Sequence, residues 1–130
     1  CPVIICHKSR EKANVVGSIT AIGDVAGKNV ITVDDMVDTA GTLAKAANVL
    51  KEMGAASVRA CATHPVFSGA AYEKIADSAL EEVIVADTIP LSNDPGKDKS
   101  KITVLSMTEM FADIINKVYN YDSISPSFIN

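Results

Sequence analysis

Apolar residues recur along the chain in two alternating periods. Short runs of strand-favouring residues, such as Asn29–Val33 and Ser57–Thr63, are followed by segments in which apolar residues return every three or four positions. The helical period that starts at Leu43 continues to Met53, and Gly54 is placed to end that helix. This alternation, with strands that are apolar almost throughout, predicts an α/β fold: a mainly parallel sheet flanked by helices on both faces.

The remaining segments fit the same order. Ser68 is expected to cap a helix over about 69–77, and Ser106 with Glu109 matches a capping box in front of an apolar stripe of helical period. No repeat or internal boundary interrupts the pattern, so residues 1–130 are predicted to form a single domain. Further strands are expected at Val3–Cys6, Ser18–Gly23, Glu82–Ala86 and Ile102–Leu105.

Charge and cysteine content narrow the function classes. A formal net charge of −4 argues against a nucleic-acid partner, and no apolar run is long enough to span a membrane. Cys1, Cys6 and Cys61 show no Cys-x-x-Cys spacing. Free thiols in a reducing cytoplasm are therefore favoured over a metal or redox role.

The strand at 30–33 runs into two adjacent carboxylates and then into a turn of small residues, Asp38–Thr42, before a helix. Gly41 lets the backbone approach a ligand closely, and Thr39 and Thr42 supply hydroxyl donors. The free amides and the dipole at the start of the helix favour an anion. This order of residues predicts a phosphate-binding loop.

The two carboxylates, Asp34 and Asp35, do not suit a phosphate, because like charges repel. They suit sugar hydroxyls, which need acceptors, or a divalent cation, which needs oxygen ligands and would be held through water rather than directly. A bare Asp-Asp pair is more often a solvated turn. Beside a phosphate loop, however, the pair indicates a site for a sugar phosphate.

A charged segment over about 7–17 separates the first two expected strands and carries Lys8 and Arg10. Such a segment is commonly a solvated hairpin tip. Its position shortly before the phosphate loop favours another interpretation, a flexible arm that closes over a bound polyphosphate and brings positive charge to it.

The string Asp34–Thr42 resembles the phosphoribosyl-pyrophosphate loop of type I phosphoribosyltransferase-fold proteins, and in particular that of the ribose-phosphate pyrophosphokinase family. The arm resembles the flexible catalytic loop of that family, with Lys8 and Arg10 at the positions of its catalytic lysine and arginine. Similar landmarks follow at 22–28, 63–69 and 88–90. The resemblance implies that ribose 5-phosphate is bound by Asp34, Asp35, Asp38, Thr39, Ala40, Gly41 and Thr42.

The end of the chain resembles the Ser-x-Ser-x-x-Phe terminus of the same family through Ser123, Ser125 and Phe128. There the resemblance implies a site for a regulatory phosphate or for the phosphates of ADP, across a subunit interface. The alternative is a frayed, hydroxyl-rich terminus.

Members of this family are more than twice as long as the chain, which resembles their C-terminal half. The resemblance implies that a longer, cytoplasmic, homo-oligomeric (hexameric) enzyme transfers pyrophosphate from Mg²⁺-bound ATP to ribose 5-phosphate. Most ATP contacts would lie in the missing N-terminal half, so the chain alone is expected to be inactive. A nucleotide-salvage phosphoribosyltransferase and a non-catalytic regulatory subunit are the alternatives; the presence of Lys8 and Arg10 favours the enzyme.

Overall fold

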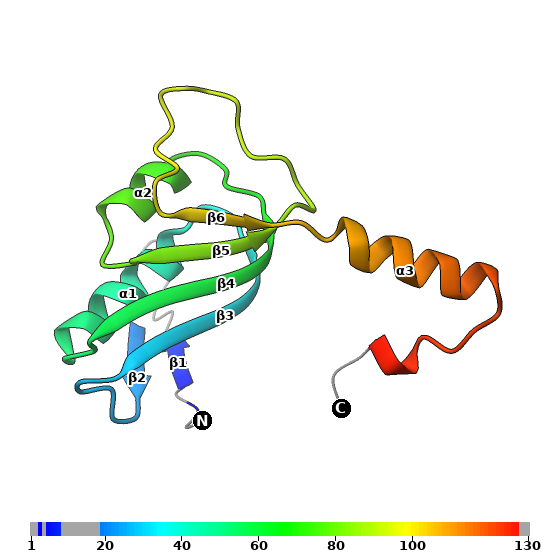
Figure 1. Ribbon diagram of the computed structural model, residues 1–130. Coiled ribbons are helices and arrows are strands. Elements are labelled where there is room, and N and C mark those ends of the chain that lie inside the picture. Colours follow the sequence, from blue (N-terminus) through cyan, green and yellow to red (C-terminus); the bar gives the residue numbers. More distant parts are fainter. Residues whose placement is uncertain (1–2, 4, 9–18, 128–130) are drawn as a thin grey trace.

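The structure is a computed structural model and describes residues 3, 5–8 and 19–127. Its main sheet is four-stranded and parallel, in the order β3-β4-β5-β6 (Figure 1). Two further strands, β1 and β2, form a separate antiparallel ribbon. The strands are β1 (Ile5–Lys8), β2 (Ile19–Ile22), β3 (Asn29–Val37), β4 (Ser57–Pro65), β5 (Glu82–Ala86) and β6 (Ile102–Leu105). The prediction of a mainly parallel α/β sheet is confirmed.

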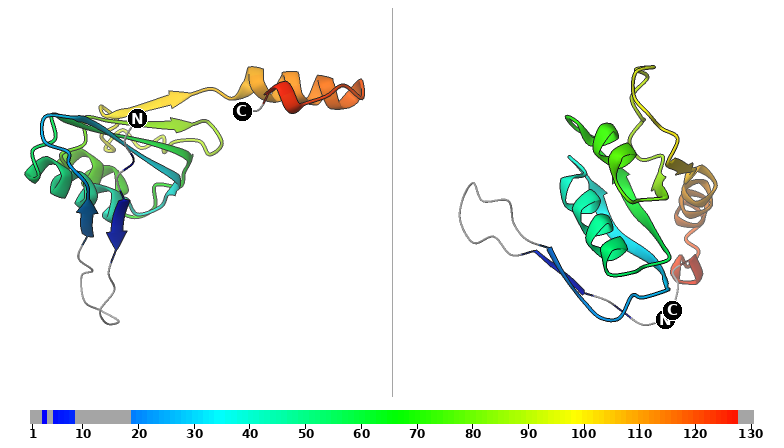
Figure 2. Two further views of the ribbon diagram at one scale, coloured as in Figure 1. Left: turned by 90° about the horizontal axis from the view of Figure 1, so that it is seen from below. Right: turned by 90° about the vertical axis from the view of Figure 1, so that its left-hand side faces the viewer.

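Two helices, α1 (Gly41–Glu52) and α2 (Ala71–Asp77), pack on the same face of the main sheet (Figure 2). Alternate strand residues point into this layer, as the period of a strand requires. Leu50 of α1, Ile75 of α2 and Val83 of β5 are fully buried within it. The core therefore lies between one face of the sheet and two helices.

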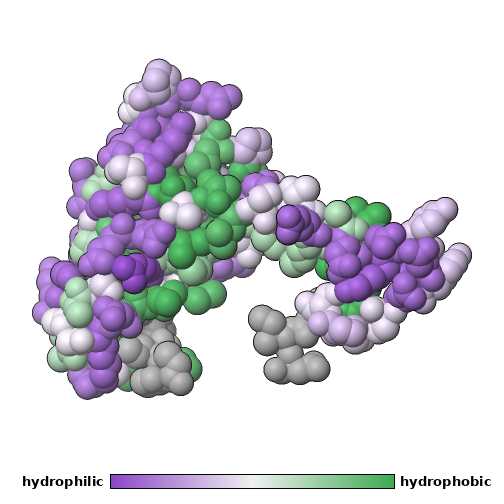
Figure 3. Space-filling model, viewed as in Figure 1, coloured by the Kyte–Doolittle hydropathy of each residue, from purple (hydrophilic) through white to green (hydrophobic). Residues whose placement is uncertain are grey.

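The other face of the sheet is open and apolar. Ile31 and Val33 of β3 keep 62% and 81% of their surface exposed. Figure 3 shows apolar residues gathered over the strands on this side. Within the described residues no helix covers this face, so the helices expected on both faces are found on one.

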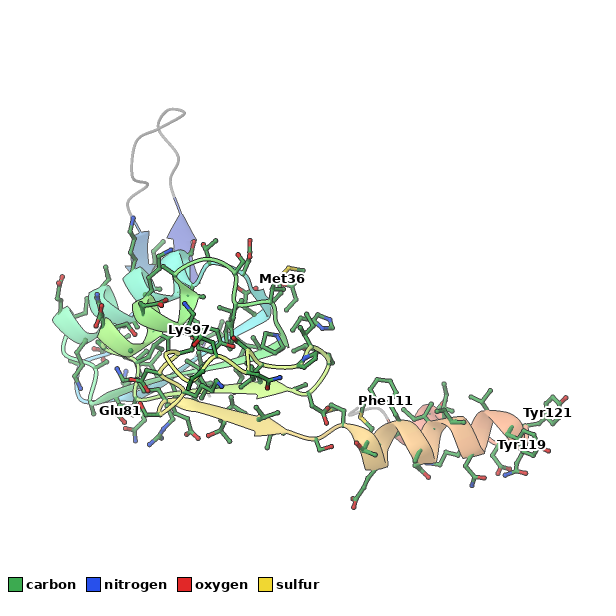
Figure 4. All side chains as sticks on the ribbon, turned by 90° about the horizontal axis from the view of Figure 1, so that it is seen from above. Met36, Glu81, Lys97, Phe111, Tyr119 and Tyr121 are labelled. Carbon is green, nitrogen blue, oxygen red and sulfur yellow. The ribbon has the colours of Figure 1, made fainter. Side chains whose placement is uncertain are left out.

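The third helix, α3 (Thr108–Tyr119), continues from the end of β6 and extends away from the sheet (Figure 1). None of its residues is buried. Phe111 and Tyr119 are 52% and 81% exposed and stand well apart from the strands, as does Tyr121 (Figure 4). A short 3₁₀ helix, η1 (Ser125–Ser127), folds back so that Ser127 accepts a hydrogen bond of 2.9 Å from Lys117. The apolar stripe of α3 is present as predicted, but within the described residues it is at most partly covered.

Several element boundaries differ from those expected. β3 continues four residues past Val33, because its pairing with β4 extends to Val37 opposite Pro65, and the two carboxylates therefore lie within the strand. β1 begins later than expected and includes Lys8, which lies opposite Ile19 of β2. No helix in the described part of the chain is both long and apolar enough to cross a membrane.

The expected cap of α2 is wrong, and that of α3 is found only in part. α2 begins at Ala71 rather than at 69, and its N-cap residue, Ala70, makes no side-chain cap; the hydroxyl of Ser68 donates to Asp38. α3 begins at Thr108 without a side-chain cap at its N-cap residue, Met107. Ser106 nevertheless accepts the N–H of Thr108 at 3.3 Å, and it donates its own proton at 2.7 Å to Asp87, which directly follows β5.

Candidate phosphate-binding site at the carboxyl end of the sheet

The turn from β3 into α1 places the first backbone N–H groups of a helix at the carboxyl edge of the sheet. Ala40 adopts a left-handed conformation, with φ of 56°, and α1 begins at the next residue. The first N–H groups of a helix have no intrahelical acceptor, and the N-cap residue, Ala40, has no side chain that could cap them. None of the residues in the first turn of α1 is acidic, so no carboxylate of that turn competes for these amides. The turn can accept an anion at the carboxyl edge of the sheet, where ligands of such sheets bind.

Gly41 is not required by the fold. The residue of the turn with positive φ is Ala40, so the backbone angles at 41 are open to any residue. A Cβ built on Gly41 would approach nothing closer than the Nζ of Lys74 and the Oγ1 of Thr39, both at 3.8 Å. Because neither packing nor backbone strain demands a glycine, its effect is to leave space over the amides. That space suits a phosphate oxygen.

The two carboxylates of β3 are exposed and each uses one oxygen locally. Asp34 Oδ1 accepts the N–H of Asp35 at 2.9 Å, and Asp35 Oδ1 accepts the N–H of Met36 at 2.8 Å. No group of three or more His, Cys, Asp or Glu side chains among the described residues could enclose a metal ion. A pair of carboxylates fits Mg²⁺ that keeps most of its water, the usual mode for this ion.

Asp38 fastens the loop to the segment after β4. Its carboxylate accepts the hydroxyl of Ser68, and its carbonyl accepts the N–H of Ser68 at 3.0 Å. The N–H of Phe67 donates to the carbonyl of Val37, also at 3.0 Å. The carboxylate of Asp38 is thus directed at protein, which suits a residue that shapes the phosphate loop.

Lys74 is a residue of this site that the sequence did not indicate. It comes from α2 and donates from Nζ to the carbonyl of Thr39 at 3.0 Å, across 35 residues of sequence. Nothing in the local pattern around Lys74 sets it apart from other helix lysines, so only the fold shows that it reaches the loop.

A second feature at the same edge of the sheet involves His64, at the end of β4. The hydroxyl of Thr88 donates to the carbonyl of Thr63 at 3.0 Å, and the same oxygen lies 2.9 Å from His64 Nδ1. Since the single proton of Thr88 is already used, His64 Nδ1 is the donor in this contact. The Nε2 of a neutral His64 is then an acceptor.

The other residues singled out from the sequence are not brought to the loop. Lys8 belongs to β1, and only its backbone is described; Arg10 and Phe128 lie outside the described residues. Ser123 and Ser125 follow α3, away from the sheet, where the N–H of Ser125 donates to Ser123 Oγ at 3.3 Å.

A parallel sheet whose strand β3 leads through a short turn into a helix at the carboxyl edge defines the class: an α/β protein of the kind whose ligands lie at that edge. Comparison with known proteins gives the family. Residues 4–129 match the model of the phosphoribosyl synthetase-associated domain, and the chain belongs to this family.

The similar proteins carry names for the same enzyme. The chain is 57% identical over 127 residues to a ribose-phosphate pyrophosphokinase of Wolinella succinogenes and 51% identical over 127 residues to one of Campylobacter jejuni. Each match covers 98% of the chain but 40% of the relative. The crystal structure of phosphoribosylpyrophosphate synthetase from Mycobacterium smegmatis superimposes with a TM-score of 0.81 at 40% identity, over 92% of the chain and 37% of that protein. The chain therefore spans about two fifths of the length of these relatives.

Proposed function

We propose that the chain is the ribose 5-phosphate-binding part, in the C-terminal half, of a ribose-phosphate pyrophosphokinase. The observation that carries this proposal is the turn of Ala40 and Gly41, which opens the first amides of α1 to an anion without any need of the fold for glycine. The names of the relatives supply the reaction class.

In the proposed reaction, the anomeric hydroxyl oxygen of ribose 5-phosphate attacks the β-phosphorus of ATP. The bond from that phosphorus to the oxygen bridging the α-phosphate breaks, AMP leaves, and the hydroxyl proton passes to solvent. The product is phosphoribosyl pyrophosphate. Such a reaction depends mainly on the positioning of the reactants and on charge stabilisation.

The loop would bind the 5-phosphate through the amides and hydroxyls of Thr39–Thr42, and so fix the sugar in one orientation. Asp34 and Asp35 would accept hydrogen bonds from the sugar hydroxyls or from the waters of Mg²⁺. Bound Mg²⁺ supplies positive charge to the phosphates of ATP. Asp38 holds the loop in shape through Ser68.

Lys8 and Arg10 are proposed to neutralise charge that develops on the transferred group. Lys8 lies at the end of β1, in the ribbon that precedes β3, and the proposal for Arg10 rests on the sequence alone. An arginine in this role can contribute about a thousandfold or more in rate.

The proposed longer chain is supported by the surfaces that the described residues leave uncovered. The open face of the sheet and the stripe of α3 expose large apolar side chains that a folded assembly normally covers. The missing N-terminal half and the other subunits of a homo-oligomer, hexameric in the family, are the proposed partners. A site for regulatory phosphate or ADP, formed with Ser123, Ser125 and Phe128, belongs to the same proposal, as does a cytoplasmic location.

The test is a titration of the ¹⁵N-labelled chain with ribose 5-phosphate, followed by NMR. The amides of Thr39, Gly41 and Thr42 should shift at millimolar ligand, whereas ribose without its phosphate should leave them unmoved. In parallel, the longer protein should release AMP from ATP only when ribose 5-phosphate is present, and the 130-residue chain should release none. The proposal would be contradicted if the amide resonances of the loop did not shift with ribose 5-phosphate. It would also be contradicted if the 130-residue chain, free of contaminating kinase, released AMP.

A further inference from the structure

We infer that Lys74 of α2 is a phosphate-recognition residue of the loop, whose ammonium supplies the positive charge that the backbone amides lack. The inference rests on the proposed phosphate site and adds a residue to it from a second helix. It concerns the binding of the 5-phosphate, not the transfer of pyrophosphate.

The position of the ammonium is the first argument. Lys74 Nζ lies 3.0 Å from the carbonyl oxygen of Thr39 and 3.8 Å from the place where a side chain on Gly41 would begin. The direction left open by the missing side chain of Gly41 therefore leads toward the ammonium. A phosphate oxygen that enters over the amide of Gly41 meets Lys74 on its way.

The second argument is charge. In the described part of the chain Lys74 forms no salt bridge, whereas Lys97 and Lys117 pair with carboxylates at 2.7 and 2.6 Å. The neighbouring carboxylate, Glu73, is the partner of Lys97, and this hydrogen bond is the main reason that the pKa of Glu73 lies below its ordinary value. The ammonium of Lys74 is left with a carbonyl as its protein partner, and a phosphate dianion would complete the pairing.

Packing holds α2, and with it Lys74, in place. Tyr72 is buried and its ring meets the ring of Phe67 edge-on, with centroids 5.2 Å apart. Its hydroxyl accepts the N–H of Ser92 at 3.0 Å. Because α2 is anchored by this aromatic pair, the ammonium two residues later is directed at the loop from a rigid element.

An ammonium has three protons to donate. The contact with Thr39 uses one of them and also fixes the turn in the form that exposes its amides. The other protons are available to a ligand. Lys74 would thus both shape the loop and pair with the phosphate, and the two effects can be separated by substitution.

Three variants make the test. Lys74→Met removes the charge and the donor, while Lys74→Gln removes the charge but keeps a donor for the carbonyl of Thr39. Lys51→Met is the matched control, because Lys51 Nζ also donates to a backbone carbonyl, that of Ala56 at 2.7 Å, but at the opposite end of α1. Each variant is titrated with inorganic phosphate and with ribose 5-phosphate at low and at physiological salt, and followed through the amide resonances of Gly41 and Thr42.

Both Lys74 variants should bind phosphate about fivefold to tenfold more weakly at low salt, the range expected for one charged contact near a surface. Their affinity should also depend less on salt than that of the unaltered chain, since screening acts on the lost charge. Lys51→Met should bind as the unaltered chain does. The amide spectra and the thermal midpoints show that each variant is folded.

Two outcomes would overturn the inference while the phosphate site stands: Lys74→Met binding as tightly as Lys51→Met, or Lys74→Gln keeping full affinity. The second would mean that Lys74 only supports the carbonyl of Thr39. If the unaltered chain failed to bind phosphate at these amides, the proposed function would fall and this inference with it.

Discussion

The hydroxyl of Ser68 donates a hydrogen bond to the carboxylate of Asp38, which lies 30 residues earlier in the chain. The pair joins the phosphate loop to the turn after β4, where Phe67 and Gly69 both have positive φ. Two neighbouring backbone bonds, from the N–H groups of Phe67 and Ser68, run in parallel with it. The proposed phosphate loop is thus held in place by residues from another part of the chain.

Replacing Ser68 by Ala should weaken phosphate binding more than it weakens the fold. The loss of one exposed hydrogen bond costs about 1 kcal/mol of unfolding free energy, but it also leaves the charge of Asp38 free to repel the anion. Phosphate titration and urea unfolding measure the two effects. Thr103→Val is the matched control, since Thr103 donates to the carboxylate of Glu82 at 2.7 Å away from the loop. If Ser68→Ala and Thr103→Val bound phosphate with equal affinity, the contact between Asp38 and Ser68 would have no role in phosphate binding.

Gly41→Ala should lower the affinity for phosphate without lowering the free energy of unfolding. Alanine is favoured over glycine within a helix by about 1 kcal/mol, and the added methyl meets nothing closer than 3.8 Å, so the free energy of unfolding should stay equal or rise. Phosphate affinity should fall, because the methyl occupies the approach to the amides.

The control is Gly54→Ala. At Gly54 φ is +90°, so alanine there should destabilise the fold while phosphate binding persists. Chemical unfolding and phosphate titration of both variants check the prediction. A Gly41→Ala chain that binds phosphate normally would mean that no ligand approaches this glycine.

The strand, turn and helix of the proposed phosphate loop could be predicted from the sequence because they are consecutive and lie within residues 30–53; that the loop binds phosphate stays a prediction. Lys74 and Ser68 could not, because each meets the loop across 30 residues or more, and no periodicity reports which helix lysine will face which turn. The prediction of the two caps was wrong or incomplete for a related reason. Ser68 and Ser106 each donate to a carboxylate from a distant segment, Asp38 and Asp87, and only Ser106 also contacts an amide of the helix start, that of Thr108.

The parallel order of the sheet followed from the alternation of strands and helices, but the surface that α3 packs against did not. An apolar stripe predicts that a helix face will be covered and says nothing of what covers it. Within the described residues the stripe of α3 remains exposed, as does the open face of the sheet around Val33. Both are the surfaces on which a longer chain or a second subunit would be expected.

The attachment of α3 should weaken in acid. Asp87 accepts the N–H of Met107 at 2.9 Å and the hydroxyl of Ser106 at 2.7 Å, and these bonds, the first above all, hold the pKa of Asp87 below its ordinary value. A lowered pKa means that this contribution to stability is complete above about pH 4 and is lost as the pH falls through the folded value. The amide resonance of Met107 should report the change, and Asp87→Asn should abolish it. An unaltered titration of that amide in Asp87→Asn would assign it to another group.

In the complete enzyme, Lys8→Ala and Arg10→Ala should each lower kcat far more than they raise KM for ribose 5-phosphate. The reason is that the proposed charge stabilisation acts on the transition state, not on the bound sugar. Lys74→Met supplies the contrast, since it should chiefly raise that KM. Steady-state measurement of AMP release gives both constants. A variant at Lys8 or Arg10 with normal kcat and raised KM would favour the alternative interpretation of this segment as a solvated hairpin tip.

Asp35→Asn should weaken the binding of ribose 5-phosphate without weakening the binding of inorganic phosphate. The substitution keeps the size of the side chain and an oxygen able to accept the N–H of Met36, which Asp35 now binds at 2.8 Å, so the strand end should persist. What it removes is charge, on which hydrated Mg²⁺ depends. Binding of ribose 5-phosphate in the presence of Mg²⁺ should therefore weaken, while inorganic phosphate should bind as before or slightly more tightly, because a repelling carboxylate is gone.

Thr42→Ala should weaken the binding of both ligands. It removes a hydroxyl donor of the loop, and the loss of a hydrogen bond to a charged group is about 1.5–3 kcal/mol, so both phosphate and ribose 5-phosphate should bind more weakly. The control for the change of net charge in Asp35→Asn is Asp122→Asn, which removes a carboxylate beyond α3, away from the loop. Calorimetry with the two ligands, with and without Mg²⁺, gives the comparison. The proposal assigns the sugar to the carboxylates and the phosphate to the loop. It would be contradicted if Asp35→Asn weakened the binding of both ligands equally, or if Thr42→Ala weakened the binding of neither.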